Sequence, residues 1–132
     1  AQNSQHVLNH PTLALDNRVY VANGRADGQV VAVHEPWRIS AQPLLMGGMD
    51  FRFDPISGQY DAVTGYGQFG LTFDEFGNRF ICVNRNPCQQ VVLENRYLAR
   101  NRYLAVSGVV HDVSPPAAKV WTAKNCTPSL KL

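Results

Sequence analysis

The sequence predicts an all-β protein, and three observations support this fold class. Aromatic and charged residues alternate with a period of two between Met49 and Pro87, as expected for strands with one buried face. The alternating runs are separated by turn sequences rich in Asp, Pro, Asn and Gly, which supply the backbone angles that tight turns require. Part of this pattern also occurs a second time in the chain, which indicates an internal repeat.

The N-terminal part of the chain is expected to form a hairpin followed by a third strand. Residues 13–24 (LALDNRVYVANG) alternate aliphatic side chains around a turn at Asp16 and Asn17. A third strand is expected at 29–33, where four of the five residues are Val or Ala. Residues 34–48 contain two prolines and two adjacent glycines, so they are expected to form a loop.

The central stretch is expected to form two further hairpins. The first runs from 51 to 63 with its turn at 54–58 (DPISG), and the second runs from 71 to 83 with its turn at 74–78 (DEFGN).

The C-terminal part has a weaker pattern. A strand is expected at 91–93, a helical turn within 94–101 and a last strand within 106–113. The tail at 114–132 is left unassigned.

The repeat relates the hairpin that begins at Leu13 to the hairpin that begins at Leu71, 58 positions later. Both hairpins enter through an apolar-x-apolar-Asp sequence, contain Asn-Arg and end at an Asn. The first repeat is expected to cover about residues 10–66 and the second about residues 67–113. Each repeat would hold four or five short antiparallel strands, which is the content of a propeller blade. The sequence therefore predicts a partial β-propeller of about two four-stranded blades: a fragment, a protomer of a ring, or a small sheet packing of another kind.

Composition limits the classes of function. The 132-residue chain has the size of one domain, and its net charge of +2 does not indicate a nucleic-acid partner. No apolar run approaches the roughly 20 residues of a membrane-spanning helix, and the N-terminus has no signal-peptide pattern. Cys82, Cys88 and Cys126 do not have the spacing of a zinc site, so no metal ligands are assigned.

Several motifs resemble one family of propeller enzymes. They are FRFDP at 51–55, QFG-x-x-FD-x-x-G-x-RF at 68–80 and NRN at 84–86, followed by VVLENRYLARNRYLAV at 91–106. Over roughly residues 13–113 the chain resembles the propeller domain of the PVC-type membrane-bound dehydrogenases, which are similar to glucose/sorbosone dehydrogenases.

The resemblance implies a six-bladed propeller that binds pyrroloquinoline quinone and oxidises an aldose or a related alcohol. It also implies a periplasmic or exported enzyme, in which a base takes a hydroxyl proton while a hydride passes to the quinone. Haem is not expected, because the CxxCH motif that attaches it in some members does not occur in this sequence. Ca²⁺ is a candidate cofactor through Asp54 and Asp74, although Asp is common at the start of turns for structural reasons.

Four residues are candidate cofactor ligands. The loop at 65–70 (GYGQFG) lacks the Arg-Asn pair that holds the cofactor's carboxylates in the quinone-binding members, but it contains Gln68. Asn84, Arg85 and Asn86 follow a strand of the second repeat and exceed the polar residues that a turn needs. A hydrogen bond between blades would also explain Gln68.

Four further residues are candidates for contact with substrate. His10 is the candidate catalytic base, since an imidazole can accept a proton near neutral pH. It lies, with His6, in the region that holds the catalytic His of the family, at a different spacing. Asn23, Arg25 and Asp27 follow a strand of the first repeat and are candidate substrate ligands. The competing interpretations are a loop histidine without a role, and Asn and Asp side chains that satisfy turn backbone.

Two functions of different classes follow. The first is a fragment of an exported quinone-dependent sugar or alcohol dehydrogenase. The alternative is a non-catalytic propeller that binds carbohydrate or protein partners. Both expect further blades or self-association, because two blades alone would leave strand edges and apolar faces open.

Overall fold

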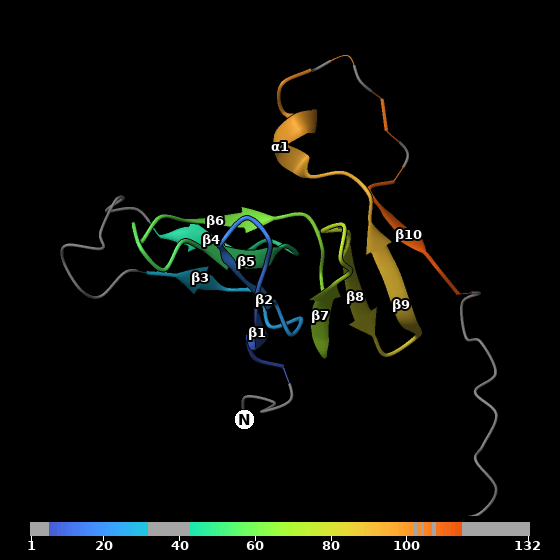
Figure 1. Cartoon of the computed structure of the whole chain (residues 1–132), viewed down its shortest axis with the longest axis horizontal. Helices are drawn as coiled ribbons and strands as arrows, with labels where there is room; N and C mark the ends of the chain where they lie inside the picture. Colours follow the sequence, from blue (N-terminus) through green and yellow to red (C-terminus); the bar gives the residue numbers. More distant parts are fainter. Residues whose placement is uncertain (1–5, 32–42, 102, 104, 107, 115–132) are drawn as a thin grey trace, which may run out of the picture.

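The computed structural model describes residues 6–31, 43–101, 103, 105–106 and 108–114, and it consists mainly of two antiparallel four-stranded sheets (Figure 1). The N-terminal sheet has the order β1 (Asn9–Leu13), β2 (Val19–Ala22), β5 (Asp50–Phe53) and β6 (Tyr60–Val63). The C-terminal sheet has the order β10 (Val110–Asp112), β9 (Asn86–Val91), β8 (Arg79–Val83) and β7 (Gly70–Phe73). The predicted all-β class is confirmed.

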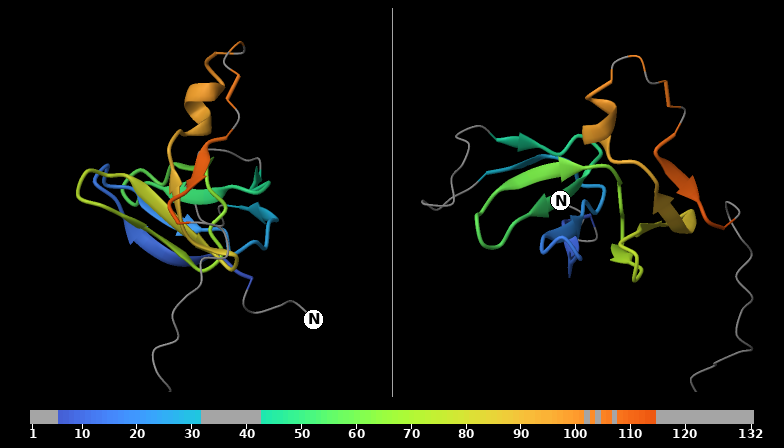
Figure 2. Two further views of the ribbon diagram at one scale, coloured as in Figure 1. Left: turned by 90° about the vertical axis from the view of Figure 1, so that its right-hand side faces the viewer. Right: turned by 45° about the horizontal axis from the view of Figure 1, so that its top comes forward.

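Two small elements lie outside these sheets (Figures 1 and 2). A hairpin of β3 (Gln29–Val30) and β4 (Leu44–Leu45) leaves the N-terminal sheet between β2 and β5. The short helix α1 (Asn95–Leu98) follows β9, within the segment expected to form a helical turn. Among the residues that the structure describes, no helix has the length and apolar character needed to cross a bilayer.

The first hairpins of the two sheets have the same loop. In each, the fourth loop residue donates its amide to the carbonyl of the first, from Asn17 to Ala14 (3.0 Å) and from Gly77 to Asp74 (3.1 Å). Both donors have positive φ, 59° for Asn17 and 82° for Gly77, which Asn and Gly tolerate best. Asn17 and Gly77 are 60 positions apart, so the structural repeat has this offset and not the 58 positions inferred from the Leu-x-x-Asp match.

The third strand of the N-terminal sheet differs from the prediction. The segment at 29–33 was expected to continue the sheet, but β2 pairs with β5, with Val19 opposite Phe53 and Val21 opposite Phe51. Within 29–33 the structure describes β3 as Gln29–Val30, and 32–33 lie outside the described residues. The pairing of β2 with β5 is favoured because it places aliphatic and aromatic side chains beside one another across the strands.

The third strand of the C-terminal sheet begins earlier than predicted. β9 starts at Asn86, which pairs with Val83, so that only Asn84 and Arg85 separate β8 from β9. Only Val91, the last residue of β9, belongs to the strand expected at 91–93. The sequence NPCQQ within β9 lacks an apolar alternation, and its strand conformation comes from pairing with β8.

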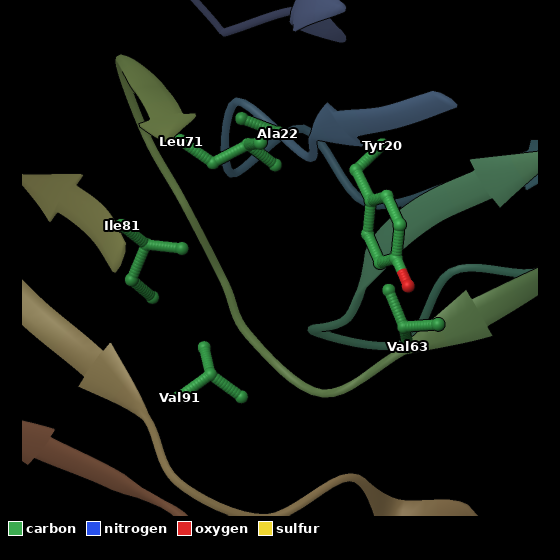
Figure 3. Close-up of a cluster of buried hydrophobic side chains, with 6 residues drawn as sticks. All are labelled: Tyr20, Ala22, Val63, Leu71, Ile81 and Val91. Atoms are coloured by element: carbon green, nitrogen blue, oxygen red, sulfur yellow. The ribbon is translucent and has the colours of Figure 1, made fainter. Parts of the chain in front are cut away.

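The two sheets lie side by side, with β1 and β7 adjacent and β6 and β10 further apart (Figure 1). The core lies between the sheets and is formed by six buried side chains, drawn in Figure 3: Tyr20, Ala22, Val63, Leu71, Ile81 and Val91. The first three come from the N-terminal sheet and the last three from the C-terminal sheet. Phe73 adds an edge-on contact to the ring of Tyr20, with ring centroids 5.0 Å apart.

A buried carboxylate joins the loops of the two sheets. Asp50, the first residue of β5, has no exposed surface, and its Oδ1 accepts the amide hydrogens of Asn23 (3.0 Å) and Gly67 (2.9 Å). Burial raises the pKa of Asp50 above its ordinary value, although these hydrogen bonds and the charge of Arg79 oppose the shift. At Gly65, where φ is 121°, a side chain would overlap the Asp50 carboxylate, so glycine is required there.

Arg79, the first residue of β8, carries the positive charge that lies near Asp50. Its side chain is 3% exposed, its Nη2 donates to Glu94 Oε1 (3.0 Å) and to the carbonyl of Thr64, and its Nη1 lies 3.9 Å from Asp50 Oδ2. The guanidinium also lies over the ring of Tyr20, 5.2 Å from its centroid. The cation therefore ties β8 to strands and loops of the other sheet.

Replacing the buried carboxylate should destabilise the whole fold. Asp50→Ala leaves the amides of Asn23 and Gly67 without their acceptor and removes one of the charges that balance Arg79. We expect the free energy of unfolding in urea to fall by about 3 kcal/mol. Asp112→Ala, which removes an exposed carboxylate from the edge strand β10, should change it by less than about 0.5 kcal/mol. Equal losses in the two variants would contradict this role of Asp50.

The raised pKa of Asp50 should also give a pH-dependent contribution to stability. Between the ordinary value of 3.8 and the raised folded value, the native state binds more protons at this residue than the unfolded state. The contribution of Asp50 is therefore fully present below the ordinary value and is lost as pH rises through the folded value. We expect the difference in unfolding free energy between wild type and Asp50→Asn to fall as pH rises from the ordinary value of 3.8 through the raised value of the folded state. A difference that grows with pH would contradict the sign of the shift.

Candidate functional site

Four segments converge at one end of the two sheets. The beginnings of β1 and β7 and the ends of β2 and β8 lie at this end, because neighbouring strands are antiparallel. The segments enclose a cavity of about 230 Å³, which has both polar and apolar walls. It is lined by His6, Arg25, Gln68, Val83, Asn84 and Arg85. We call this cavity the polar pocket.

Gln68 holds the centre of the polar pocket and is only 8% exposed. Its backbone amide donates to the carbonyl of Cys82 (2.9 Å), and its side-chain oxygen accepts the amide hydrogen of Asn84 (3.1 Å). Its Nε2 lies 3.5 Å from Nε2 of His6. Gln68 therefore fixes the turn of Asn84 and Arg85, whose side chains are exposed, against the segment that joins the two sheets.

Arg25 reaches the polar pocket from the segment that follows β2. Its backbone has φ of 59°, and its guanidinium lies 5.1 Å from the ring centroid of Tyr66. The hydroxyl of Tyr66 donates to Asp27 (3.1 Å), and Asp27 also accepts the amide hydrogen of Gly48 (2.9 Å). Burial, together with this bond to Asp27, raises the pKa of Tyr66. Asp27 thus holds the Tyr66 ring on which Arg25 lies. Asp27 itself is not among the residues that line the pocket.

Asn23 and Asn86 are also outside the lining of the polar pocket. Asn23 is 1% exposed; its Nδ2 donates to the carbonyl of Met49 (2.8 Å), and its oxygen accepts the amides of Ala26 and Asp27. The oxygen of Asn86 accepts the amide hydrogen of Cys88 (3.1 Å) and lies 3.3 Å from the Ser114 hydroxyl. The structure therefore uses both amides to hold turns and strand ends.

His10 is separated from the polar pocket. It lies in β1 with φ of 55°, packs against Gly70, and lines a different cavity of about 270 Å³ with Phe80 and Cys82. The imidazole inside the polar pocket belongs to His6. His6 was noted in the same region of the sequence as His10 but was not selected, since it lies in an irregular polar segment and approaches Gln68 only through the fold.

The candidate calcium ligands are part of turns at the other end of the sheets. Asp54 accepts the amides of Ile56 (2.8 Å) and Ser57 (3.1 Å), and these bonds lower the pKa of Asp54. Asp74 makes side-chain and backbone bonds to Asn78, which lower the pKa of Asp74 in the same way. Within the part of the chain that the structure describes, no group of three or more His, Cys, Asp or Glu residues is placed to hold a metal ion.

Of the eight residues predicted for the site, the structure brings four together in the polar pocket: Arg25, Gln68, Asn84 and Arg85. The pocket thus combines two guanidinium groups, two side-chain amides and one imidazole. Such a set of donors can bind carboxylates or other anions, and it can also donate hydrogen bonds to hydroxyl groups.

Comparison with known proteins places this chain in one family. The chain belongs to a family described as a domain of unknown function, DUF7133, whose sequence profile matches residues 1–130. Neither the curated proteins nor the solved structures give a significant match.

Removing the side-chain amide of Gln68 should loosen the turn of Asn84 and Arg85. Gln68→Met keeps the length of the side chain but leaves the Asn84 amide without its acceptor. We expect faster hydrogen exchange at that amide and a loss of about 1 kcal/mol in unfolding free energy. Gln59→Met, at an exposed position, should leave both unchanged. Unchanged exchange at Asn84 in the Gln68 variant would contradict the role of Gln68.

Proposed function

We propose that this chain forms part of an exported, quinone-dependent sugar or alcohol dehydrogenase of the propeller type, and that the polar pocket binds the cofactor's anionic groups. The observation that carries the proposal is the convergence of Arg25, Arg85 and Gln68 at the end where β1 and β7 lie side by side. The resemblance of the sequence motifs to sugar dehydrogenases supplies the reaction class.

The arrangement of the sheets supports adjacent blades of a propeller. Each sheet has four antiparallel strands, and β7, the first strand of the C-terminal sheet, contacts both β1 and β2 of the N-terminal sheet. Propeller blades are arranged in this way around a central axis. On this interpretation the polar pocket lies on the axial side of both blades, where sites shared between blades form.

The donors of the polar pocket fit a quinone that carries carboxylates. The loop at 65–70 lacks the Arg-Asn pair expected from the resemblance, but its Gln68 lines the same pocket as Arg25 and Arg85. Guanidinium groups bind carboxylates through paired hydrogen bonds, so these two arginines can replace the missing anchor. When bound, the quinone would supply the two-electron acceptor. Ca²⁺ does not fit this pocket, because none of its lining residues has a carboxylate.

His6 is the residue in the pocket that is suited to take a proton. Its Nε2 lies 3.5 Å from the Gln68 amide, which can orient the imidazole. Because the amide nitrogen of Gln68 can only donate, it occupies the imidazole's lone pair until a substrate hydroxyl takes its place, and Nε2 can then accept the proton of that hydroxyl. The candidate base from the sequence, His10, faces the other cavity, and we assign the proton transfer to His6 for this reason.

Binding of pyrroloquinoline quinone should depend on the two arginines of the pocket. We expect Arg25→Gln and Arg85→Gln each to raise the dissociation constant about tenfold or more, which corresponds to the loss of a charged hydrogen bond. Titration followed by intrinsic fluorescence would measure it. Arg18→Gln is the matched control, because Arg18 lies in the loop at the other end of the sheets and should leave the affinity unchanged.

Three outcomes separate the candidate functions. Quinone binding together with dye-linked oxidation of an aldose, lost in His6→Ala, would support the dehydrogenase. Saturable binding of a glycan or a protein, without quinone binding, would favour the non-catalytic propeller. If the wild-type protein does not bind the quinone and oxidises no aldose in its presence, the dehydrogenase proposal is wrong.

A further inference from the structure

The N-terminal sheet has an apolar face that points away from the core. Phe51 and Phe53 lie on this face with ring centroids 5.8 Å apart, and Tyr60 lies 6.0 Å from Phe51. These side chains and Val30 line an apolar cavity of about 450 Å³. The hydroxyl of Tyr60 is buried and has no hydrogen-bond partner among the described residues. We call this surface the open face of the N-terminal sheet.

The C-terminal sheet also has an open face on the side away from the core. Ile81 of β8 points into the core, so its neighbours Phe80 and Cys82 point the other way. Both line the cavity of about 270 Å³, together with Cys88 of β9. Each sheet therefore buries one face against the other sheet, and the described residues cover its second face only in part, through Val30 of the β3–β4 hairpin on the N-terminal sheet and through His10 on the C-terminal sheet.

The 60-residue offset relates the open faces to the faces that are already packed. It places Phe80 at the position of Tyr20, and Cys82 at the position of Ala22. Tyr20 and Ala22 belong to the face of the N-terminal sheet that packs in the core. The open face of the C-terminal sheet is thus equivalent, by the repeat, to the face of the N-terminal sheet that is buried in the core.

The converse relation holds for the other two faces. The same offset places Ile81 at the position of Val21, which pairs with Phe51 on the open face of the N-terminal sheet. It also places Phe73 at the position of Leu13, which is 66% exposed. Inside one chain, the face of the N-terminal sheet that carries Tyr20 packs on the face of the C-terminal sheet that carries Ile81. By the repeat, the open face with Phe80 is equivalent to the Tyr20 face, and the open face with Phe51 is equivalent to the Ile81 face.

The charges of the packed interface have no counterpart on the open faces. Arg79, the buried cation of the core, corresponds to Val19 at the 60-residue offset. Arg52, buried on the inner face of the N-terminal sheet, pairs with Tyr20, as Gln90 pairs with Phe80 in the other sheet. Contact between the open faces would therefore bury neither of these guanidinium groups, and apolar burial would drive it.

We propose that a second copy of this chain covers each open face, with the open face of the C-terminal sheet of one copy packed on the open face of the N-terminal sheet of the next. Such a contact is head-to-tail, because the two surfaces differ. It repeats the packing already present between the two sheets, so successive copies would continue the same row of sheets until the row closes. The proposal does not depend on the ligand of the polar pocket.

Lysine substitutions that each block one face provide the test. Phe53→Lys blocks the open face of the N-terminal sheet, and Phe80→Lys blocks that of the C-terminal sheet. By light scattering after size exclusion we expect wild type to form an oligomer and each variant alone to be a monomer. A mixture of the two variants should form a dimer, because it retains one intact pair of faces. Phe76→Lys is the control: Phe76 is 81% exposed in the β7–β8 loop, so this variant should behave as wild type.

Several results would overturn the proposal. A monomeric wild type at high concentration would mean that other blades or partners cover the faces. An oligomer that persists in Phe53→Lys but not in Phe80→Lys would indicate contact between two like faces.

If a lysine variant does not fold, as judged by circular dichroism, thiol labelling of Cys126→Ser gives a second test. Cys82 and Cys88 should be protected at high protein concentration and should react after dilution. Equal reaction rates at all concentrations would contradict the proposal.

Discussion

The ion pair between Asp50 and Arg79 is the interaction on which the relation between the two sheets depends. Asp50 begins the third strand of one sheet, and Arg79 begins the second strand of the other. Each is almost completely buried, and their charged atoms lie 3.9 Å apart. Because a buried carboxyl or guanidinium group without partners would be costly, the amides that bond to Asp50 and the contacts of Arg79 with Glu94 and Thr64 favour the arrangement that brings both groups together.

The same pair positions the polar pocket. Asp50 binds the amides of Asn23 and Gly67, which lie two positions before Arg25 and one before Gln68. Gln68 then holds the turn that carries Arg85. The buried carboxylate therefore fixes the backbone from which both guanidinium groups of the pocket extend. A rigid backbone favours an anion site, because the entropy lost on binding is then limited to that of the arginine side chains.

Local signals account for what the sequence predicted, and long-range contacts account for what it did not. Turn residues such as Asn17 and Gly77 marked the hairpins, and the alternation of apolar residues marked most strands. The pairing of β2 with β5 was missed because residues 23–49 intervene. Arg25, Asn84 and Arg85 were identifiable because they follow strands that end at the same end of the sheets, and Gln68 because it lies in the loop that the resemblance assigns to the cofactor. Asn23 followed the same pattern, but burial turned its amide toward the backbone, and no sequence signal distinguishes that outcome.

The position of the polar pocket connects ligand binding with packing of the sheets. Its lining comes from both sheets, with Arg25 from the segment after β2 and Arg85 from the turn after β8. Packing two sheets face to face thus creates a site that neither sheet has alone. If copies of the chain stack through their open faces, the corresponding loops of neighbouring copies would also meet. The chemistry at that second junction would differ, because the 60-residue offset relates Arg85 to Arg25, another arginine, but relates Gln68 to the apolar Leu8. A closed assembly would therefore present unequal sites around its axis, which allows one to hold a cofactor and another to admit substrate.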